Sequence, residues 1–468
     1  MQTIEQGRLR AVVAAVQKAG VSDFEFGESL SELRHLATTL GYEVVASFTQ
    51  KRGKAESHAY LGVGKRQEVS RFVRGAPAEA GDADASGDSE DEADADAAAQ
   101  GVESGPADEA TRRADVLLVD HEISPSQALN LAKEVGCEVM DRTMVILEIF
   151  HRHARTRAAR AQVEIVRLGY MAPRMREAAK LARPTGRQRS GAGGRGAGES
   201  QGELDRRKVH DRIVELQREI DSMDADRQTQ RARRRDHEGL ARVALVGYTN
   251  AGKSTLMRAL TGSEVLVANK LFATLDTTVR ALHPETVPRV LVTDTVGFIK
   301  NLPHGLVASF KSTLEEALEA SLVLHVVDAS DPGFERQLGV TETVLDEIGG
   351  SAVPRLLVFN KIDRVVGADA RAAHTAMLQA RYPECVVISS QDPADIDRMR
   401  EAIVAFFQQG REEIEFLLPW SAQHLLGEIH GTCEVREERS EVDGTHFRVG
   451  GDARAINRLR ERLAQLGG

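Results

Sequence analysis

With 468 residues and a formal net charge of −10, the chain is long enough for several domains that each bury a core. Its three cysteines, Cys137, Cys385 and Cys433, are too widely spaced for a metal-ligand pattern or a disulfide framework, which fits a reducing compartment. No apolar run approaches a membrane span, and the N-terminus lacks a signal-peptide core, so we expect a cytoplasmic protein.

The negative charge is concentrated in one segment. Between Glu79 and Glu109 there are 12 acidic residues and no basic ones, in a background of Ala, Gly and Ser. Because so little of this segment is apolar, we expect a disordered acidic insert at about 75–112. Without it the chain carries about +2. The insert and a low use of lysine also suggest a salt-loving source organism.

Residues 1–150 are expected to form a small α/β domain around this insert. Hydrophobic periodicity predicts helices at Leu30–Leu40 and Pro125–Val135, and strands at Tyr42–Phe48, Val116–Val119 and Cys137–Met140. A GxGK stretch, Gly62 to Lys65, has two interpretations: a phosphate contact, or a turn between a strand and a helix.

Residues 151–238 are strongly basic, with 22 Lys and Arg against 11 Asp and Glu between Arg152 and Arg235. The pattern predicts a helix over 151–183, a Gly/Arg/Ser loop over 184–200 and a second helix at Gln201–Arg235. Such a helical hairpin with a basic tip suits contact with RNA phosphates. The alternative is a solvated hairpin whose seam buries only its aliphatic residues.

Residues 239–409 alternate strand and helix patterns, as in a doubly wound sheet, and contain a GxxxxGK[ST] phosphate loop. An apolar strand precedes this loop and a helix follows it. Its backbone N–H groups are expected to face phosphates, with Lys253 at the β- and γ-phosphates and the Ser254 hydroxyl on Mg²⁺. The predicted binding residues are Gly247, Tyr248, Thr249, Asn250, Ala251, Gly252, Lys253 and Ser254.

A DxxG motif follows the apolar strand Val290–Thr293 and comprises Asp294, Thr295, Val296 and Gly297. The carboxyl end of a parallel strand lies beside the phosphate site in such sheets. We therefore expect Asp294 to hold Mg²⁺ through a water molecule and Gly297 to offer its N–H to the γ-phosphate.

An NKxD motif closes another apolar strand and comprises Asn360, Lys361, Ile362 and Asp363. The Asp363 carboxylate can accept from guanine N1–H and the exocyclic amine, whereas adenine would leave it unpaired. Asn360 would contact the other edge of the base, and the Lys361 stem would pack on its face. A guanine-contacting loop or a simple strand-ending turn is expected at Ser389, Ser390 and Gln391.

Two positions bear on hydrolysis and ions. Phe298 stands where Ras-like GTPases have a glutamine that orients the attacking water, so we expect slow intrinsic hydrolysis and no catalytic side chain there. Asn250 has two interpretations: its amide oxygen is a candidate K⁺ ligand, or it is a turn residue with an unusual backbone conformation. Between the first two motifs, a threonine-rich stretch over 271–278 suits a γ-phosphate-sensing loop, and its spacing leaves the choice of Mg²⁺ ligand open.

The final residues, 410–468, predict a small α/β appendage without a chemical motif. We expect strands at Glu412–Leu418, Thr432–Glu438 and Thr445–Val449, and helices at Ser421–His430 and Ala453–Leu466. Asp443 and Gly444 predict a hairpin turn.

The motifs as a set resemble the HflX GTPases of the Obg-like branch. The resemblance rests on the phosphate loop, Phe272 to Asp276 and Asp294 to Phe298. It also rests on N-terminal motifs at 60–65, 120–127, 141–143, 149–150, 154–157 and 162–164, and on the GES-Q ending of the glycine-rich loop at 198–201. It implies that Thr274 is the second Mg²⁺ ligand and that the nucleotide also contacts Phe272, Ala273, Leu275 and Asp276. A proline often found after that aspartate is missing here.

The resemblance implies a Mg²⁺-dependent GTPase that binds GTP and GDP and associates with the large ribosomal subunit and its rRNA, in ribosome splitting, rescue or biogenesis. We expect a monomer when free, in the cytoplasm and partly on ribosomes. One alternative is an ATP-driven RNA remodeller that uses the N-terminal domain. Another is a signalling GTPase with a protein effector. The fold class expected is α/β and multidomain.

Overall fold

The structure is a computed structural model, and it divides the chain into two compact units, Met1–Arg152 with Glu164–Ile213 and His153–Val163 with Val214–Gly468. Most of the expected acidic insert and the loop at 184–200 lie outside the described residues. The described residues are 9–52, 59–75, 113–182, 201–235, 241–262, 271–272, 278–286, 289–300, 302, 306, 319–409 and 411–466.

The first unit contains four parallel strands in the order β2-β1-β3-β4. The strands are β1 (Arg10–Lys18), β2 (Glu43–Arg52), β3 (Val116–Val119) and β4 (Glu138–Asp141), and the helices α1 (Asp23–Thr39), α2 (Val63–Val73), α3 (Pro125–Val135) and α4 (Arg142–His153). β1 is missing from the predicted strands. Its residues 11–16 are all buried, as in parallel strands covered on both faces, so no alternation identified it.

The basic region forms two long helices, α5 (Arg157–Ala182) and α6 (Gln201–Arg235). The prediction of one continuous helix over 151–183 is wrong, because α4 ends at His153 and α5 begins at Arg157. Thr156 caps the new helix by accepting from the Ala159 N–H at 3.2 Å. Ion pairs of Arg157 with Glu219 and of Glu164 with Arg212 place α5 and α6 antiparallel to each other.

The central sheet has six strands in the order β10-β9-β8-β5-β7-β6, and only β6 runs antiparallel to its neighbour. Its strands are β5 (Ala241–Gly247), β6 (Thr278–Ala281), β7 (Val290–Asp294), β8 (Leu322–Asp328), β9 (Arg355–Asn360) and β10 (Val386–Val387). Its helices are α7 (Lys253–Thr261), α10 (Phe334–Glu347), α11 (Ala368–Arg381) and α12 (Pro393–Gln408), with short 3₁₀ turns η2 (Gly350–Ala352) and η3 (Ile362–Arg364).

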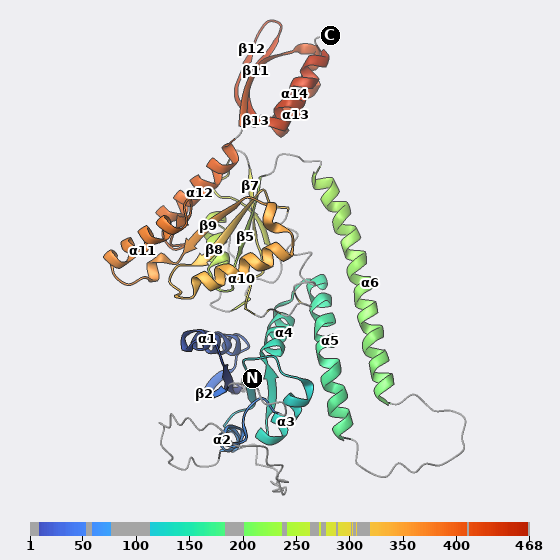
Figure 1. Ribbon diagram of the computed structural model, residues 1–468. Helices are drawn as coiled ribbons and strands as arrows, with labels where there is room; N and C mark the ends of the chain where they lie inside the picture. The colour runs from blue at the N-terminus through green and yellow to red at the C-terminus, as the bar shows by residue number, and fades with distance from the viewer. Residues whose placement is uncertain are drawn as a thin grey trace, which may run out of the picture. The chain divides into compact units, whose positions relative to one another are not determined.

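Helices cover both faces of this sheet (Figure 1). Leu245 packs with residues of α7 and α12, whereas its neighbour Val246 packs with Leu345 of α10. Successive strand residues point to opposite faces, so this arrangement requires an apolar strand throughout. The doubly wound class expected from the sequence is confirmed, with one antiparallel edge strand.

The C-terminal sheet is antiparallel, in the order β11-β13-β12, and one face packs against helices. Its elements are β11 (Arg411–Pro419), α13 (Leu426–Thr432), β12 (Glu434–Ser440), β13 (Gly444–Asp452) and α14 (Ala453–Leu466). The predicted hairpin is formed, and the Glu441 N–H donates to the Gly444 carbonyl at 2.8 Å. The helix predicted at Ser421–His430 is wrong at its start, where a 3₁₀ turn, η4 (Trp420–Leu425), precedes α13.

The α/β, multidomain fold class is therefore confirmed. The domain boundaries expected from the sequence stay a prediction. Among the helices that the structure describes, none is both long and apolar enough to cross a membrane.

Candidate nucleotide site

The phosphate loop joins β5 to α7 and depends on two glycines. Gly247 has a φ of 151°, and a Cβ there would lie 2.1 Å from the Val326 carbonyl oxygen. Gly252 has a φ of 97°, and a Cβ there would lie 2.2 Å from the Asn360 side-chain nitrogen. Only glycine fits such contacts at these angles. α7 then begins at Lys253, so its N-terminus and the loop amides form a backbone site suited to an anion.

Lys253 is buried inside this loop. Its ammonium group donates to the carbonyl oxygens of Gly247 and Tyr248, each at 2.9 Å. Burial lowers its pKa to about 8, nearby Lys361 acts in the same direction, and Asp294 opposes them. A cation held among carbonyl oxygens in this way is suited to exchange them for phosphate oxygens.

Ser254 and Asp294 lie side by side because β5 and β7 are neighbouring strands. The Ser254 hydroxyl donates to Asp294 Oδ2 at 2.7 Å, and Asp294 is fully buried. A hydroxyl and a carboxylate are hard oxygen donors, which Mg²⁺ prefers, so the pair fits the expected metal. The third predicted metal residue, Thr274, lies outside the described residues, as do Ala273, Leu275 and Asp276.

The DxxG segment pairs with the phosphate loop through its backbone. The Thr249 N–H donates to the Phe298 carbonyl at 2.6 Å, and the Phe298 N–H donates to the Gly247 carbonyl at 3.1 Å. A Cβ at Gly297 would lie 2.8 Å from the Thr249 Cα, so this approach also requires glycine. Thr295 and Val296 are buried beside it.

Phe298 is anchored in the core under α10. It is 2% exposed and packs with Val246, Val323 and Leu345. An apolar side chain in this position has no group that can orient water, and the absence of a catalytic role there stays a prediction.

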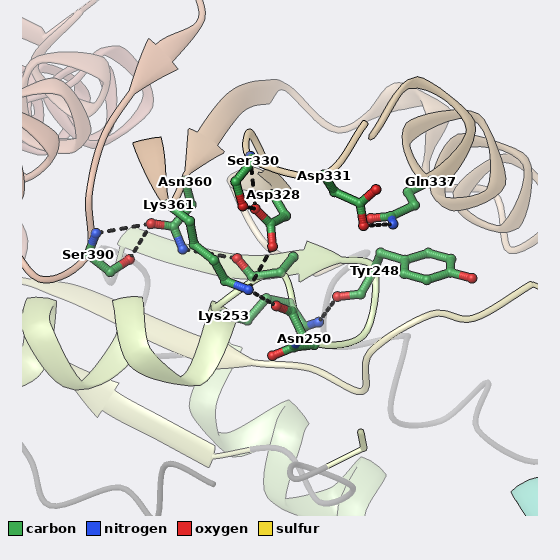
Figure 2. Close-up of polar contacts among 11 residues, drawn as sticks. Tyr248, Asn250, Lys253, Asp328, Ser330, Asp331, Gln337, Asn360, Lys361 and Ser390 are labelled. Carbon is green, nitrogen blue, oxygen red and sulfur yellow. Dashed lines mark hydrogen bonds and ion pairs between the residues drawn. The ribbon is translucent and has the colours of Figure 1, made fainter. Parts of the chain in front are cut away.

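The NKxD segment connects three parts of the site (Figure 2). Asn360 donates from Nδ2 to the Ala251 carbonyl at 2.9 Å, and its Oδ1 accepts from the Ser390 N–H and hydroxyl at 3.0 and 2.7 Å. Lys361, at a φ of 64°, donates to the Asn250 carbonyl at 2.5 Å. The first motif, the third motif and the serine loop are therefore joined by direct hydrogen bonds.

Asp363 lies in η3 with an exposed carboxylate, while Ile362 beside it is buried. Arg371 fixes the Asp363 backbone by donating to its carbonyl at 3.1 Å. The serine loop is also ordered locally, since the Gln391 N–H donates to the Ser389 hydroxyl at 3.2 Å. Asp363 therefore lies on a turn whose backbone is held in place, and its side chain is accessible to a nucleobase.

Asn250 has a φ of 61°, in the left-handed region that asparagine tolerates better than most residues. Its interpretation as a turn residue is therefore confirmed. Its role as a K⁺ ligand stays a prediction. Tyr248 is buried, and its hydroxyl accepts from the Lys300 N–H at 2.8 Å, so this ring links the loop to the residues after Phe298.

Sequence reasoning missed Asp328, which ends β8. Its Oδ2 pairs with Lys361 Nζ at 2.7 Å, and its Oδ1 accepts from the Ser330 N–H and hydroxyl at 3.0 and 2.6 Å (Figure 2). The available signal was a carboxylate directly after an apolar strand, as at Asp294. Its relevance depended on the sheet order, which puts β8 between β5 and β9.

A phosphate loop, a DxxG segment and an NKxD segment at the carboxyl edge of one doubly wound sheet define the P-loop GTPases. Family models match three consecutive parts of the chain. They are described as "GTP-binding GTPase N-terminal" at 27–80 and 102–151, "GTP-binding GTPase Middle Region" at 153–234, and "50S ribosome-binding GTPase" at 242–361.

Curated relatives are similar along nearly the whole chain. "GTPase HflX" of Gluconacetobacter diazotrophicus is 49% identical over 97% of this chain and 98% of its own length. "GTPase HflX" of Caldanaerobacter subterraneus is 34% identical over 99% and 95%, and that of Escherichia coli is 34% identical over 89% and 88%. The chain belongs to the HflX family of GTPases. These relatives give no support to the salt-loving source that the composition suggested.

Proposed function

We propose that this chain is a Mg²⁺-dependent GTPase that binds the large ribosomal subunit and its rRNA, and that it acts in ribosome splitting, rescue or biogenesis. One observation carries the nucleotide assignment: Asn360, in the NKxD motif, is hydrogen-bonded to both the phosphate loop and the serine loop, so three separate motifs meet in one site. The family description "50S ribosome-binding GTPase" supports the partner.

The proposed roles follow from the donor groups. Lys253 neutralises the β- and γ-phosphates, Ser254 and Thr274 ligate Mg²⁺, and Asp294 holds the ion through water. Asp363 recognises guanine, with contacts from the segment that contains Ser389, Ser390 and Gln391. K⁺ bound near Asn250 is a further proposed cofactor.

Hydrolysis by the free protein should be slow, because Phe298 is buried and apolar. The large subunit would then accelerate it by positioning water or neutralising transition-state charge, as partner proteins do for other GTPases. The protein would be a monomer when free, in the cytoplasm and partly ribosome-bound.

The basic helices α5 and α6 are the proposed rRNA contact. They belong to a stretch with twice as many basic as acidic residues, and binding to RNA phosphates releases counterions for every Lys or Arg involved. We propose four domains, with boundaries near residues 150, 238 and 409, so that this contact and the nucleotide site belong to different domains.

Co-sedimentation with purified ribosomal subunits tests the proposal. We expect the protein to pellet with the large subunit when a non-hydrolysable GTP analogue is bound, and much less with GDP or without nucleotide. Lys253→Ala should abolish the nucleotide effect. Equal absence from both subunits in every state would contradict the ribosome partner and favour a protein effector. ATPase activity that survives in Lys253→Ala would instead favour the N-terminal RNA remodeller.

A further inference from the structure

A histidine outside the nucleotide motifs contacts the segment that precedes Thr274. His153 Nδ1 lies 2.9 Å from the carbonyl oxygen of Phe272. A carbonyl oxygen only accepts, so His153 donates from Nδ1. The two residues are 119 positions apart in the sequence and belong to the same compact unit.

Phe272 is held from two sides. Its N–H donates to the Thr249 hydroxyl of the phosphate loop at 3.1 Å, while its carbonyl accepts from His153. The residue is 2% exposed and has a φ of 56°. A bulky residue keeps such a conformation only where its surroundings impose it. The backbone at Phe272 is therefore fixed between the phosphate loop and His153.

His153 itself stands on a fixed backbone. Ala154 after it is buried, and its carbonyl accepts from the Arg160 guanidinium at 3.0 Å. The Thr156 cap begins α5 directly afterwards, and Ala158 is buried. The break between α4 and α5 thus presents the imidazole from a rigid position.

We propose that His153 is a positioning residue for the γ-phosphate-sensing segment. By holding Phe272, it fixes the backbone two residues before Thr274. It thereby favours the GTP-bound over the GDP-bound state. This inference rests on the proposed function, in which Thr274 ligates Mg²⁺ beside the γ-phosphate. A contact that acts there strengthens binding of GTP and leaves binding of GDP unchanged, since GDP has no γ-phosphate.

The test compares affinities for a non-hydrolysable GTP analogue with Mg²⁺ and for GDP. His153→Ala should weaken the analogue about three- to tenfold, as expected for one net hydrogen bond, and leave GDP unchanged. His153→Asn should restore the preference, because the Asn Nδ2 donor occupies nearly the place of the imidazole Nδ1. His151→Ala, at an exposed histidine two residues earlier, is the matched control and should have no effect.

Thr274→Ala is measured in parallel to separate the two ideas. If it leaves the analogue's affinity and Mg²⁺ dependence unchanged, the metal assignment in the proposed function fails. If it weakens the analogue while His153→Ala does not, the role of His153 is overturned. A His153→Ala protein that only melts earlier, with its GTP-to-GDP preference intact, would also overturn it, because that result describes a packing residue.

Discussion

At the residue scale, Lys253 is buried in the protein, yet its ammonium group must be charged when it binds phosphates. Burial lowers its pKa to about 8, so the unbound protein loses this proton above that pH. Phosphates favour the charged ammonium, so nucleotide binding takes up a proton there. Binding that is linked to proton uptake weakens as pH rises. The loss of affinity therefore begins near pH 8, the lowered pKa of Lys253.

We therefore expect affinity for GDP to fall above pH 8 by up to about tenfold per pH unit. Calorimetric titrations at pH values from about 7 to about 9 would measure it, and buffers with different ionisation heats would count the protons taken up. Lys253→Arg keeps its charge throughout and should show a flatter profile. Parallel profiles for both proteins would contradict the assignment.

Asp328 forms an ion pair with Lys361, so its negative charge should contribute to nucleotide affinity through the part of the site that binds the nucleobase. Asp328→Asn keeps the shape but removes the carboxylate that pairs with Lys361 Nζ at 2.7 Å. We expect binding of GTP and GDP to weaken equally, by about tenfold, since hydrogen bonds to charged groups are among the stronger ones.

The matched control is Asp331→Asn. Asp331 accepts from Gln337 and from the Gly333 N–H, and neither contact involves a nucleotide motif. Fluorescent-nucleotide titration should show no change for this variant. If the two substitutions have the same effect, Asp328 does not act through Lys361.

At the element scale, β8 has a histidine at its centre. His325 is 3% exposed, and its Nε2 has no hydrogen-bond partner within the described part of the chain. Burial lowers its pKa to about 4, and Arg355 and Lys253 act in the same direction. The folded protein therefore keeps this side chain neutral at pH values where the unfolded chain protonates it.

Because the folded pKa lies below the unfolded one, stability should be lost as pH falls from 6.5 toward 4. The slope is about 1.4 kcal/mol per pH unit from this group. Thermal unfolding at pH values of about 5 and 7 would measure the loss, and His325→Leu should reduce it. An equal acid-induced loss in that variant would exclude His325 as the cause.

At the scale of the whole molecule, the features that could be predicted from the sequence are those formed by residues that are consecutive in the chain. The strand, glycine loop and helix around Gly247–Ser254 are consecutive, so their pattern specified the phosphate site. Asp328 and His153 were missed because their contacts depend on strand order and on a segment 119 residues away. The break at 154–156 was missed because one threonine among residues that suit a helix is a weak signal, although Thr156 caps α5 by accepting from the Ala159 N–H.

The basic helices give the last prediction, which concerns the molecule's largest partner. Arg206 and Lys208 are exposed on α6, where each can contact an RNA phosphate. Arg206→Gln with Lys208→Gln should weaken binding to large subunits in the GTP-analogue state. It should also make the plot of log affinity against log salt shallower by about one per residue removed, because fewer counterions are released.

The control is Arg460→Gln with Arg462→Gln on α14, outside the basic region. It removes the same charge from the chain and should leave the salt slope unchanged. Filter binding or sedimentation at several salt concentrations would measure both variants. If the α6 and α14 variants both make the salt slope shallower, and by the same amount, net charge alone governs binding. If neither differs from the unaltered protein, the subunit is held by protein contacts, and α5 and α6 are a solvated pair of helices.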